Sequence, residues 1–303
     1  MQPVRLLLSF SVSGKKEAVL GMEKAVHISN LKNLKYFNKE DYQRIYWGAE
    51  FCQNLISDLK DTDKALAFAA KNASGFSFIT PLVTDSGLKK LNKAFSYLRK
   101  NNVKCEIIVN DWGVLGCLHA KFNKCFKLAL GRLLVRQQRD PSMRTVFEEQ
   151  SPYAVRDKNT GKLSVIIHRP PGGLYQKGMR ASYINSSLLQ DFLSRFGIER
   201  IELNNVIQGL YLEGIRFKKS IYTPYVNIST TRFCPMESRA QKLYRIDMCY
   251  KECQGHYYEM HSRNIPMVIY KRGNTTFYKN PLDIRSLGKN GIDRIVIQPE
   301  LPF

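Results

Sequence analysis

The 303-residue sequence predicts one α/β domain, a closed or nearly closed β/α barrel of the TIM type with an irregular insertion. Two observations predict this fold. About eight apolar runs have the length and composition of strands, and helical stretches separate several of them. The strand-like runs are apolar without alternation, which indicates a parallel sheet covered by helices. An open doubly wound sheet is the alternative arrangement.

The expected strands are short runs rich in branched and aromatic residues, and several end at glycine, proline or asparagine. In chain order the eight main runs cover residues 5–12, 44–47, 76–80, 105–109, 126–135, 198–203, 222–228 and 294–298, and a brief strand at 163–168 and a pair at 267–270 and 275–278 add to them. The runs at 267–270 and 275–278 are predicted to form a hairpin about the turn Arg272 to Asn274.

Helices are expected between most of these strands. They cover residues 31–42, the stretch after Cys52 to about residue 70, 86–100, a short segment from residue 114, and 183–196. The segment 86–100 is the clearest, because Leu88, Leu91, Phe95 and Leu98 fall on one helical face with lysines opposite.

We expect a single domain over residues 1–303. Residues 136–162 are rich in Arg, Gln, Asp, Pro and Thr, which is typical of an insertion. We therefore place an insertion at 136–175 and a C-terminal hairpin region at 262–303.

The chain carries 47 Lys and Arg against 26 Asp and Glu, a formal net charge of +21. A polyanion such as RNA is therefore a candidate partner. Because the basic residues are spread along the chain, a generally basic surface is the alternative interpretation. No run reaches the roughly 20 apolar residues of a spanning helix, so we expect a soluble, cytoplasmic protein with no membrane span.

Seven cysteines, an odd number with uneven spacing, indicate reduced thiols or metal ligands rather than a disulfide framework. Cys234 ends an apolar, strand-like run. Cys249 and Cys253 are four residues apart, which on a helix places both sulfurs on one face. Thiolate sets of this kind hold zinc or an iron–sulfur cluster.

A fourth ligand is expected among residues that follow strands, because the carboxyl ends of barrel strands gather at one rim. Cys52 follows the strand at 44–47, and we favour it. Cys117 is the rival, but it lies at the start of an apolar helix, where cysteine often packs as a small hydrophobe. Cys105 and Cys125 open strand-like runs and are expected to point into the packing.

Zinc is the main alternative at this centre. Cys234, Cys249, Cys253 and His256 would make a structural site of three thiolates and one imidazole. Against zinc, the C-x14-C-x3-C spacing lacks the paired C-x2-C knuckles typical of zinc ribbons.

Four polar residues on the same predicted rim are candidates for contact with a substrate. Asn110 and Asp111 can orient a polar group, with a strand-ending turn and a helix cap as the alternatives. Arg132 and Arg232 can hold a carboxylate or phosphate through bidentate contacts, with a surface ion pair as the alternative for Arg132. We interpret Glu50, close to Cys52, as an acidic residue in the first turn of a helix.

Several of these motifs together resemble the collagenase-like peptidase family U-32. They are WGAEFC with Cys52, NDWGVLGC after a strand, GRLL at 131–134, TPYVNISTTRFC, and the C-x14-C-x3-C ending. Within the family, the cysteine layout is most similar to the members that act in oxygen-independent ubiquinone hydroxylation. The peptidase signature around a C-x4-G-x-C core is missing near Cys234.

The resemblance implies a β/α barrel with a [4Fe-4S] cluster on four cysteines, matched here by Cys52, Cys234, Cys249 and Cys253. It implies a component of oxygen-independent hydroxylation of an aromatic ring or a nucleobase, in a quinone precursor or in RNA. A second U-32 family subunit is the implied partner, in a heterodimer. A peptidase and a non-catalytic iron–sulfur subunit are the alternatives.

Overall fold

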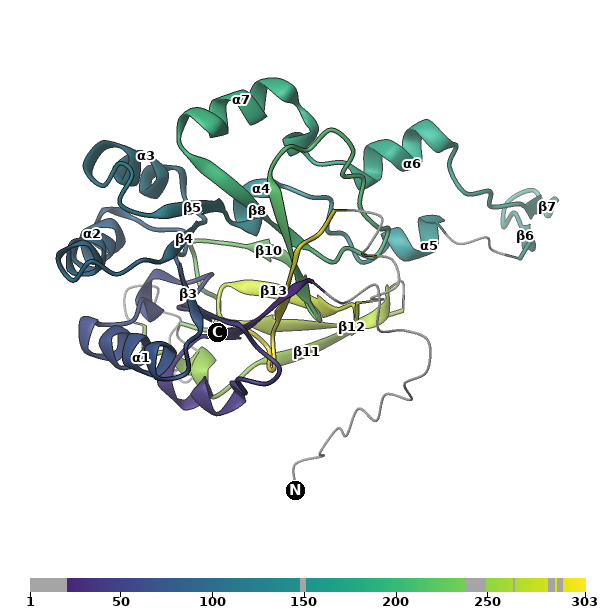
Figure 1. The fold of residues 1–303 in the computed structure, drawn as a ribbon. Helices are drawn as coiled ribbons and strands as arrows, with labels where there is room; N and C mark the ends of the chain where they lie inside the picture. Colours follow the sequence, from purple (N-terminus) through teal and green to yellow (C-terminus); the bar gives the residue numbers. More distant parts are fainter. Residues whose placement is uncertain (1–20, 148–150, 238–248, 264, 283–286, 288–290) are drawn as a thin grey trace.

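The computed structural model describes residues 21–147, 151–237, 249–263, 265–282, 287 and 291–303. Eight parallel strands close into one barrel (Figure 1). In order around the barrel they are β1 (Glu23–Ile28), β14 (Arg294–Ile297), β9 (Lys218–Thr223), β8 (Ile198–Asn204), β5 (Lys127–Leu130), β4 (Glu106–Val109), β3 (Gly75–Ile79) and β2 (Arg44–Trp47). Closure confirms the predicted β/α barrel and excludes the open doubly wound sheet.

Helices cover the outside of the barrel (Figure 1). The longer ones are α1 (Leu59–Lys71), α2 (Asp85–Lys100), α3 (Trp112–Lys121) and α7 (Ser187–Arg195). The shorter elements are α4 (Arg132–Val135), α5 (Met143–Phe147), α6 (Gly173–Arg180) and the 3-10 turns η1 (Leu31–Tyr36), η2 (Gln53–Leu55), η3 (Tyr183–Asn185) and η4 (Glu252–Gln254). Leu91, Phe95 and Leu98 of α2 are fully buried between helix and barrel, as the apolar pattern predicts.

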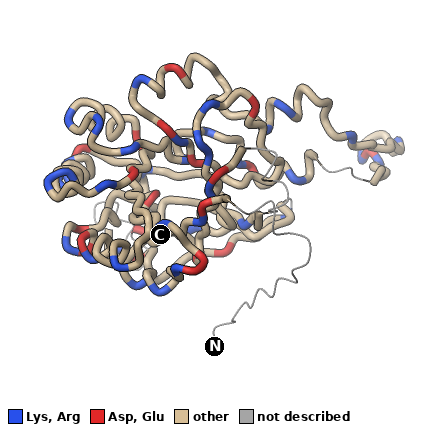
Figure 2. The backbone as a smooth tube through the Cα atoms, viewed as in Figure 1, with Lys and Arg blue, Asp and Glu red and all other residues tan. Residues whose placement is uncertain are grey.

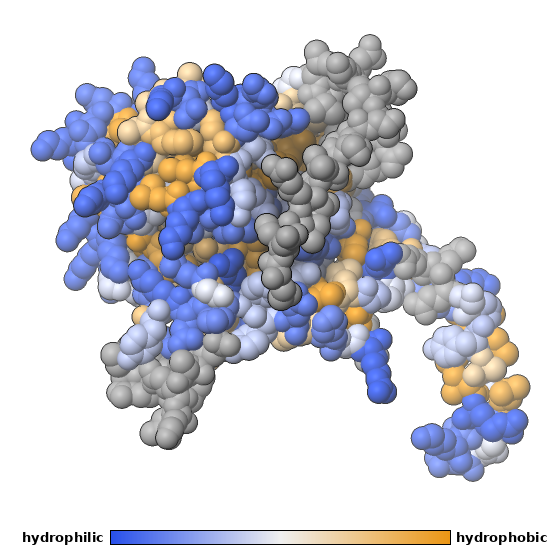
Figure 3. Space-filling model, turned by 90° about the horizontal axis from the view of Figure 1, so that it is seen from below, coloured by the Kyte–Doolittle hydropathy of each residue, from blue (hydrophilic) through white to orange (hydrophobic). Residues whose placement is uncertain are grey.

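A second sheet is antiparallel and has four strands, in the order β10 (Tyr225–Thr230), β13 (Thr275–Lys279), β12 (Ile265–Arg272) and β11 (Tyr258–Ser262). Strands β12 and β13 pair as the expected hairpin. A separate hairpin of β6 (Tyr153–Arg156) and β7 (Leu163–Ile166) projects from the body (Figure 1). Val165 is among its exposed apolar side chains. Figure 3 shows hydrophobic surface on the projecting part of the molecule.

The structure corrects the predicted elements at the start of the chain. The predicted strand at 5–12 lies outside the described residues, whereas β1 was not predicted. Its sequence, EKAVHI, includes three polar residues and therefore does not have the pattern of a buried strand. The structure accommodates two of them, because Glu23 forms ion pairs and His27 bonds to a backbone carbonyl inside the protein. The predicted helix at 31–42 is the short 3-10 turn η1.

Two further predicted strands were wrong in extent. The run at 126–135 is β5 followed by a turn at Gly131 and then α4. A β-carbon at Gly131 would lie 2.1 Å from the Asn110 amide oxygen, so close contact between these segments fixes the turn. The run at 222–228 is split between β9 and β10 at Pro224, which has no N–H to donate to a sheet.

The barrel interior contains charged side chains near its amino end. Glu106 accepts from Arg294 at 2.6 Å, and Tyr46 donates to Glu202 at 3.1 Å. Burial raises the pKa of Glu202 to about 7, and the Glu106 carboxylate acts in the same direction. Arg200 and Arg294 oppose the rise. Glu202 is therefore protonated over much of the acidic pH range in the folded protein.

No helix in the described part of the chain combines the length and apolar character that a bilayer span requires. Lys and Arg are spread over the helices, loops and projecting hairpin (Figure 2).

Glu202→Gln should reduce the loss of stability between about pH 5 and pH 7. The ordinary pKa of this carboxyl is 4.5 and its folded pKa is about 7, so the native state binds the proton more tightly. The free energy of unfolding therefore falls as pH rises through this interval, and Gln keeps the uncharged form throughout. Urea titrations at both pH values measure the difference. An equal fall in the two proteins would contradict the assignment.

Candidate metal centre

Three of the four favoured cysteines meet in one apolar cluster at the carboxyl end of the barrel. Cys253 is buried in it, and Cys52 and Cys234 pack against it. The buried members are Ala49, Phe51, Leu55, Tyr225, Met236, Cys253, Phe277, Leu301 and Phe303. These residues come from loops after β2, β10 and β14 and from the four-stranded sheet, so only the folded chain assembles them.

The turn between β12 and β13 holds two of the cysteine segments in place. Arg272 donates from Nε to the backbone oxygen of Cys253 at 2.7 Å. Asn274 donates from Nδ2 to the backbone oxygen of Phe51 at 2.8 Å, directly before Cys52. Each bond satisfies a backbone carbonyl that has no sheet partner.

Gly273, in the same turn, contacts the third cysteine segment. Its N–H lies 3.0 Å from the sulfur of Met236, two residues after Cys234. A β-carbon at Gly273 would come within 2.2 Å of the Phe303 ring, and its φ of +55° is left-handed. Only glycine meets both conditions without rearrangement.

The thiols lie near enough to influence one another electrostatically. Burial raises the pKa of Cys253 to about 12, and the Cys52, Cys234 and Cys249 sulfurs raise it further. Burial also raises the pKa values of Cys52 and Cys234, and the Cys249 sulfur adds to both shifts. Cys249 therefore belongs to the same group of thiols. Cys52, Cys234 and Cys253 stay protonated at neutral pH unless a cationic centre offsets burial and mutual repulsion.

The remaining cysteines lie elsewhere. Cys117 is on α3, where its sulfur lies 2.8 Å from the side-chain oxygen of Asn92. Cys105 is buried in the wall beside β4. Cys125 is exposed, so the expectation that it points into the packing is wrong. It lies in the turn after α3, where Lys124 adopts a left-handed backbone.

The structure places His256, the histidine of the alternative zinc set, on the surface. His256 is exposed, and its backbone N–H donates to the backbone oxygen of Glu252. Within the described residues, no three His, Cys, Asp or Glu side chains lie close enough to hold a single metal ion, and this holds for the four cysteines as well as for the zinc set.

Arg132 is fully buried and has a structural partner. Its guanidinium forms a bidentate ion pair with Glu50, at 2.7 and 2.8 Å. Further donors bond to Asn204 at 3.1 Å and the Tyr225 carbonyl at 2.9 Å. The expected surface ion pair is thus a buried one, and no face of Arg132 is open to a substrate anion. Sequence reasoning took Glu50 for an acidic residue in the first turn of a helix and missed this pairing.

The other rim candidates also contact the protein itself. Asn110 is buried, donates to Thr80 and accepts from the Leu133 N–H. Asp111 caps α3, accepting from the N–H groups of Gly113 and Val114. Arg232 is largely exposed and lies 3.9 Å from the Asp111 carboxylate. The cap alternative therefore describes Asp111, whereas Asn110 is not in a turn and links the segments after β3 and β5 through its side-chain amide.

A pocket of about 390 Å³ adjoins the cysteines. It is lined by residues after Cys253, by sheet residues and by the loop after β14, and these include Tyr225, His256, Tyr257, Tyr270, Arg272, Lys279 and Glu300. The Tyr257 and Tyr225 rings lie 6.1 and 6.4 Å from that of Tyr270. The Lys279 amine lies 5.4 Å from the Tyr225 and Tyr270 rings. Sequence reasoning did not find this pocket, because its lining comes from distant segments.

The chain is similar over 97% of its length to a solved structure described as the U32 peptidase Mk0906, 97% of which is covered, with 9% identity and a TM-score of 0.41. It is also similar over 91% of its length to a glycoside hydrolase family 18 N-acetylglucosaminidase from Paenibacillus barengoltzii, with 94% of that chain covered, 8% identity and a TM-score of 0.37. A Group IV chitinase from Ostrinia furnacalis gives 91% and 92% coverage, 7% identity and a TM-score of 0.37.

No protein-family model matches the sequence, and no curated protein is significantly similar to it. Identities of 7–9% and TM-scores below 0.5 carry no information on a reaction. The fold assignment therefore depends on the strand order of the barrel itself.

Arg132→Met should lower the free energy of unfolding by about 3–5 kcal/mol, because it leaves the Glu50 carboxylate buried without its partner. Arg232→Ala is the matched control, and loss of its exposed, long ion pair should cost less than about 1 kcal/mol. Chemical denaturation measures both. The structural role of Arg132 would be refuted if the two variants lost the same small amount.

Proposed function

We propose that this chain is an iron–sulfur protein of the U-32-like group and a component of oxygen-independent hydroxylation of an aromatic ring or a nucleobase. Cys52, Cys234, Cys249 and Cys253 are the proposed ligands of one [4Fe-4S] cluster. The observation that carries the proposal is the grouping of these four cysteines at one end of the barrel, away from the other three.

The residues present fit such a cluster. The donor set is four soft thiols, and most of the surrounding side chains are apolar, as in buried iron–sulfur sites. Lys271 and Arg272 lie near enough to lower the pKa values of Cys234 and Cys253, respectively, against the stronger effect of burial. When bound, a cluster on four thiolates supplies electron transfer or structural support, because no iron position is left open.

The tyrosine pocket supports a flat aromatic substrate. Tyr257 and Tyr270 offer ring faces, and Arg272 and Lys279 offer cationic donors at its edge. Stacking favours any planar ring, whereas hydrogen bonds select its substituents. The pocket begins one residue after Cys253, so a ring bound there lies beside the proposed cluster.

The cysteine spacing supports a finer assignment. It is most similar to the V subunit of the oxygen-independent ubiquinone hydroxylation pair, which favours a heterodimer with a second U-32 family subunit. The net charge of +21 favours instead a nucleobase within RNA, because phosphates add a strong electrostatic term to binding. Assays with a quinone precursor and with RNA separate the two substrates.

Replacing Cys52, Cys234, Cys249 or Cys253 by Ala should abolish cluster loading. Anaerobic purification should give about four irons and four sulfides per wild-type chain, quantified chemically. Cys117→Ala and Cys125→Ala are the matched controls and should load fully. Full loading of Cys52→Ala would refute the ligand set. One zinc and no sulfide would refute the proposed function.

Tyr257→Ala should weaken substrate binding roughly tenfold, because stacking on an aromatic side chain contributes about 1–3 kcal/mol per base. The control is Tyr175→Ala, a similarly exposed tyrosine on α6 outside the pocket. Binding of the quinone precursor or RNA is measured together with iron content, which should not change in either variant. Equal binding by the two variants would exclude the pocket as the substrate site.

A further inference from the structure

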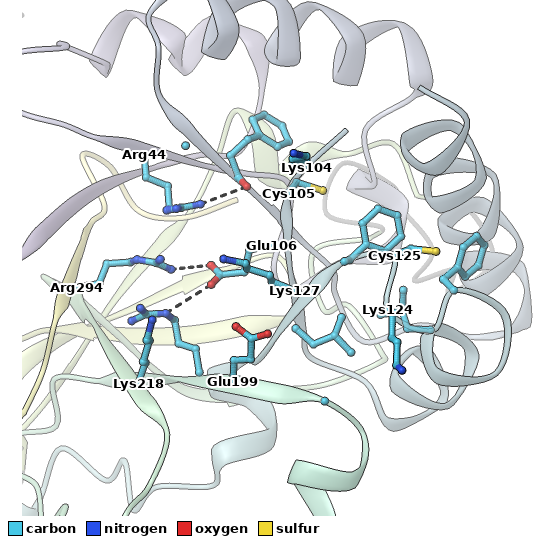
Figure 4. Close-up of a pocket in the computed structure, with 18 of the residues that line it drawn as sticks. Arg44, Lys104, Cys105, Glu106, Lys124, Cys125, Lys127, Glu199, Lys218 and Arg294 are labelled. Carbon is cyan, nitrogen blue, oxygen red and sulfur yellow. Dashed lines mark hydrogen bonds and ion pairs between the residues drawn. The ribbon is translucent and has the colours of Figure 1, made fainter. Parts of the chain in front are cut away.

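A larger cavity, of about 880 Å³, opens at the amino end of the barrel (Figure 4). Its lining includes residues at or just before the starts of β4, β5 and β9, whereas the cysteines lie beyond the carboxyl ends of the strands. The two cavities are therefore at opposite ends of the barrel, and the proposed function gives this one no role.

The charges on the inner wall of this cavity are paired with one another. Arg44 and Arg294 both bind Glu23, at 2.6 Å each. Arg294 also binds Glu106, and Arg200 binds Asp293. Three arginines thus balance three carboxylates, and the inner wall contributes little net charge.

The rim has an excess of positive charge. Lys104, Lys124, Lys127 and Lys218 line it against the single carboxylate of Glu199. No carboxylate of the described residues forms an ion pair with any of these lysines. Four ammonium groups around one opening favour a ligand that carries more than one negative charge.

The barrel register directs two of these lysines into the opening. Lys127 pairs with Glu106, and Lys218 pairs with Arg200, on neighbouring parallel strands. Residues in register on adjacent strands share one side of the sheet. Glu106 bonds to Arg294 inside the barrel, so Lys127 lies on the same inner side. Lys218 lies near Arg294 (Figure 4).

One part of the remaining wall is aromatic. It contains the half-buried rings of Phe126, after α3, and Phe196, at the end of α7, with Leu118 and Phe122 buried behind them. The His119 and Phe196 rings lie 4.8 Å apart on this side. A ligand that fills the cavity therefore meets an apolar surface on one side and ammonium groups on the other.

From this arrangement we propose that the amino end of the barrel binds a small organic phosphate with a planar apolar body, of the nucleotide class. Lys127 and Lys218, with Lys104, bind the phosphates. The rings of Phe126 and Phe196 pack against the apolar body. The volume and the two chemically different sides carry the assignment.

Titration calorimetry of the full chain with ADP tests the proposal. We expect saturable binding at one site, weakened at least about tenfold in the double variant Lys127→Gln/Lys218→Gln, because charge-assisted bonds to phosphate are lost. Pyrophosphate alone and adenosine alone should each bind more weakly than ADP, since each engages one side of the cavity.

Lys89→Gln/Lys90→Gln is the matched control. It removes the same two charges from exposed positions on α2 that do not line the cavity, and ADP binding should change less than about twofold. If thermal melting shows that the Lys127→Gln/Lys218→Gln variant is unfolded, Lys104→Gln/Lys218→Gln is tested in its place. Absence of saturable ADP binding, equal weakening in the control, or pyrophosphate binding as tightly as ADP would overturn the proposal. The proposal would also be overturned if an RNA oligonucleotide bound to the protein and ADP did not.

Discussion

A charge buried in a protein is stable only when it is paired with an opposite charge. Buried ion pairs of this kind hold segments together at both ends of the barrel. At the carboxyl end, Arg132 and Glu50 are fully buried and bound to each other through two hydrogen bonds. The pair joins the loop after β2 to α4, and Arg132 also bonds to the end of β8 and the start of β10. An isolated buried guanidinium or carboxylate would be strongly destabilising, so these segments keep their positions together.

The cysteine centre is built on that fixed rim. Phe51 and Cys52 follow Glu50 directly, so the ion pair that anchors Glu50 also places the first thiol. The turn between β12 and β13 then supplies hydrogen bonds to the segments of Cys52 and Cys253 and a contact beside Cys234. The three cysteine segments are loops or short turns, and the turn of the β12–β13 hairpin contacts all three of them from one side.

The two ends of the barrel offer different chemistry. The carboxyl end brings thiols, aromatic rings and a few cations together. The amino end brings unpaired lysines together beside phenylalanines. Between the two cavities the barrel interior is filled by buried side chains that include Tyr46, Ile79, Ile108, Tyr222 and Val296, so the barrel is a packed core and not a channel.

The sequence by itself determined the barrel class, the helix at 86–100 and the hairpin about Arg272 to Asn274. These follow from periodicity, turn residues and spacing, which are local properties. It did not reveal β1, whose polar residues are compensated by partners on distant strands. It also merged β5 with α4 and β9 with β10, because apolar runs do not show where the chain turns.

Only the tertiary structure decided what the rim residues contact. Arg132 and Asp111 are of residue types that often bind ligands. In the structure, however, Arg132 pairs with Glu50, and Asp111 caps the start of α3. The two cavities also arise from segments up to about 270 residues apart, and no local pattern encodes such contacts. Closure of the barrel decided that Cys52, and not Cys117, packs against the same apolar cluster as Cys234 and Cys253.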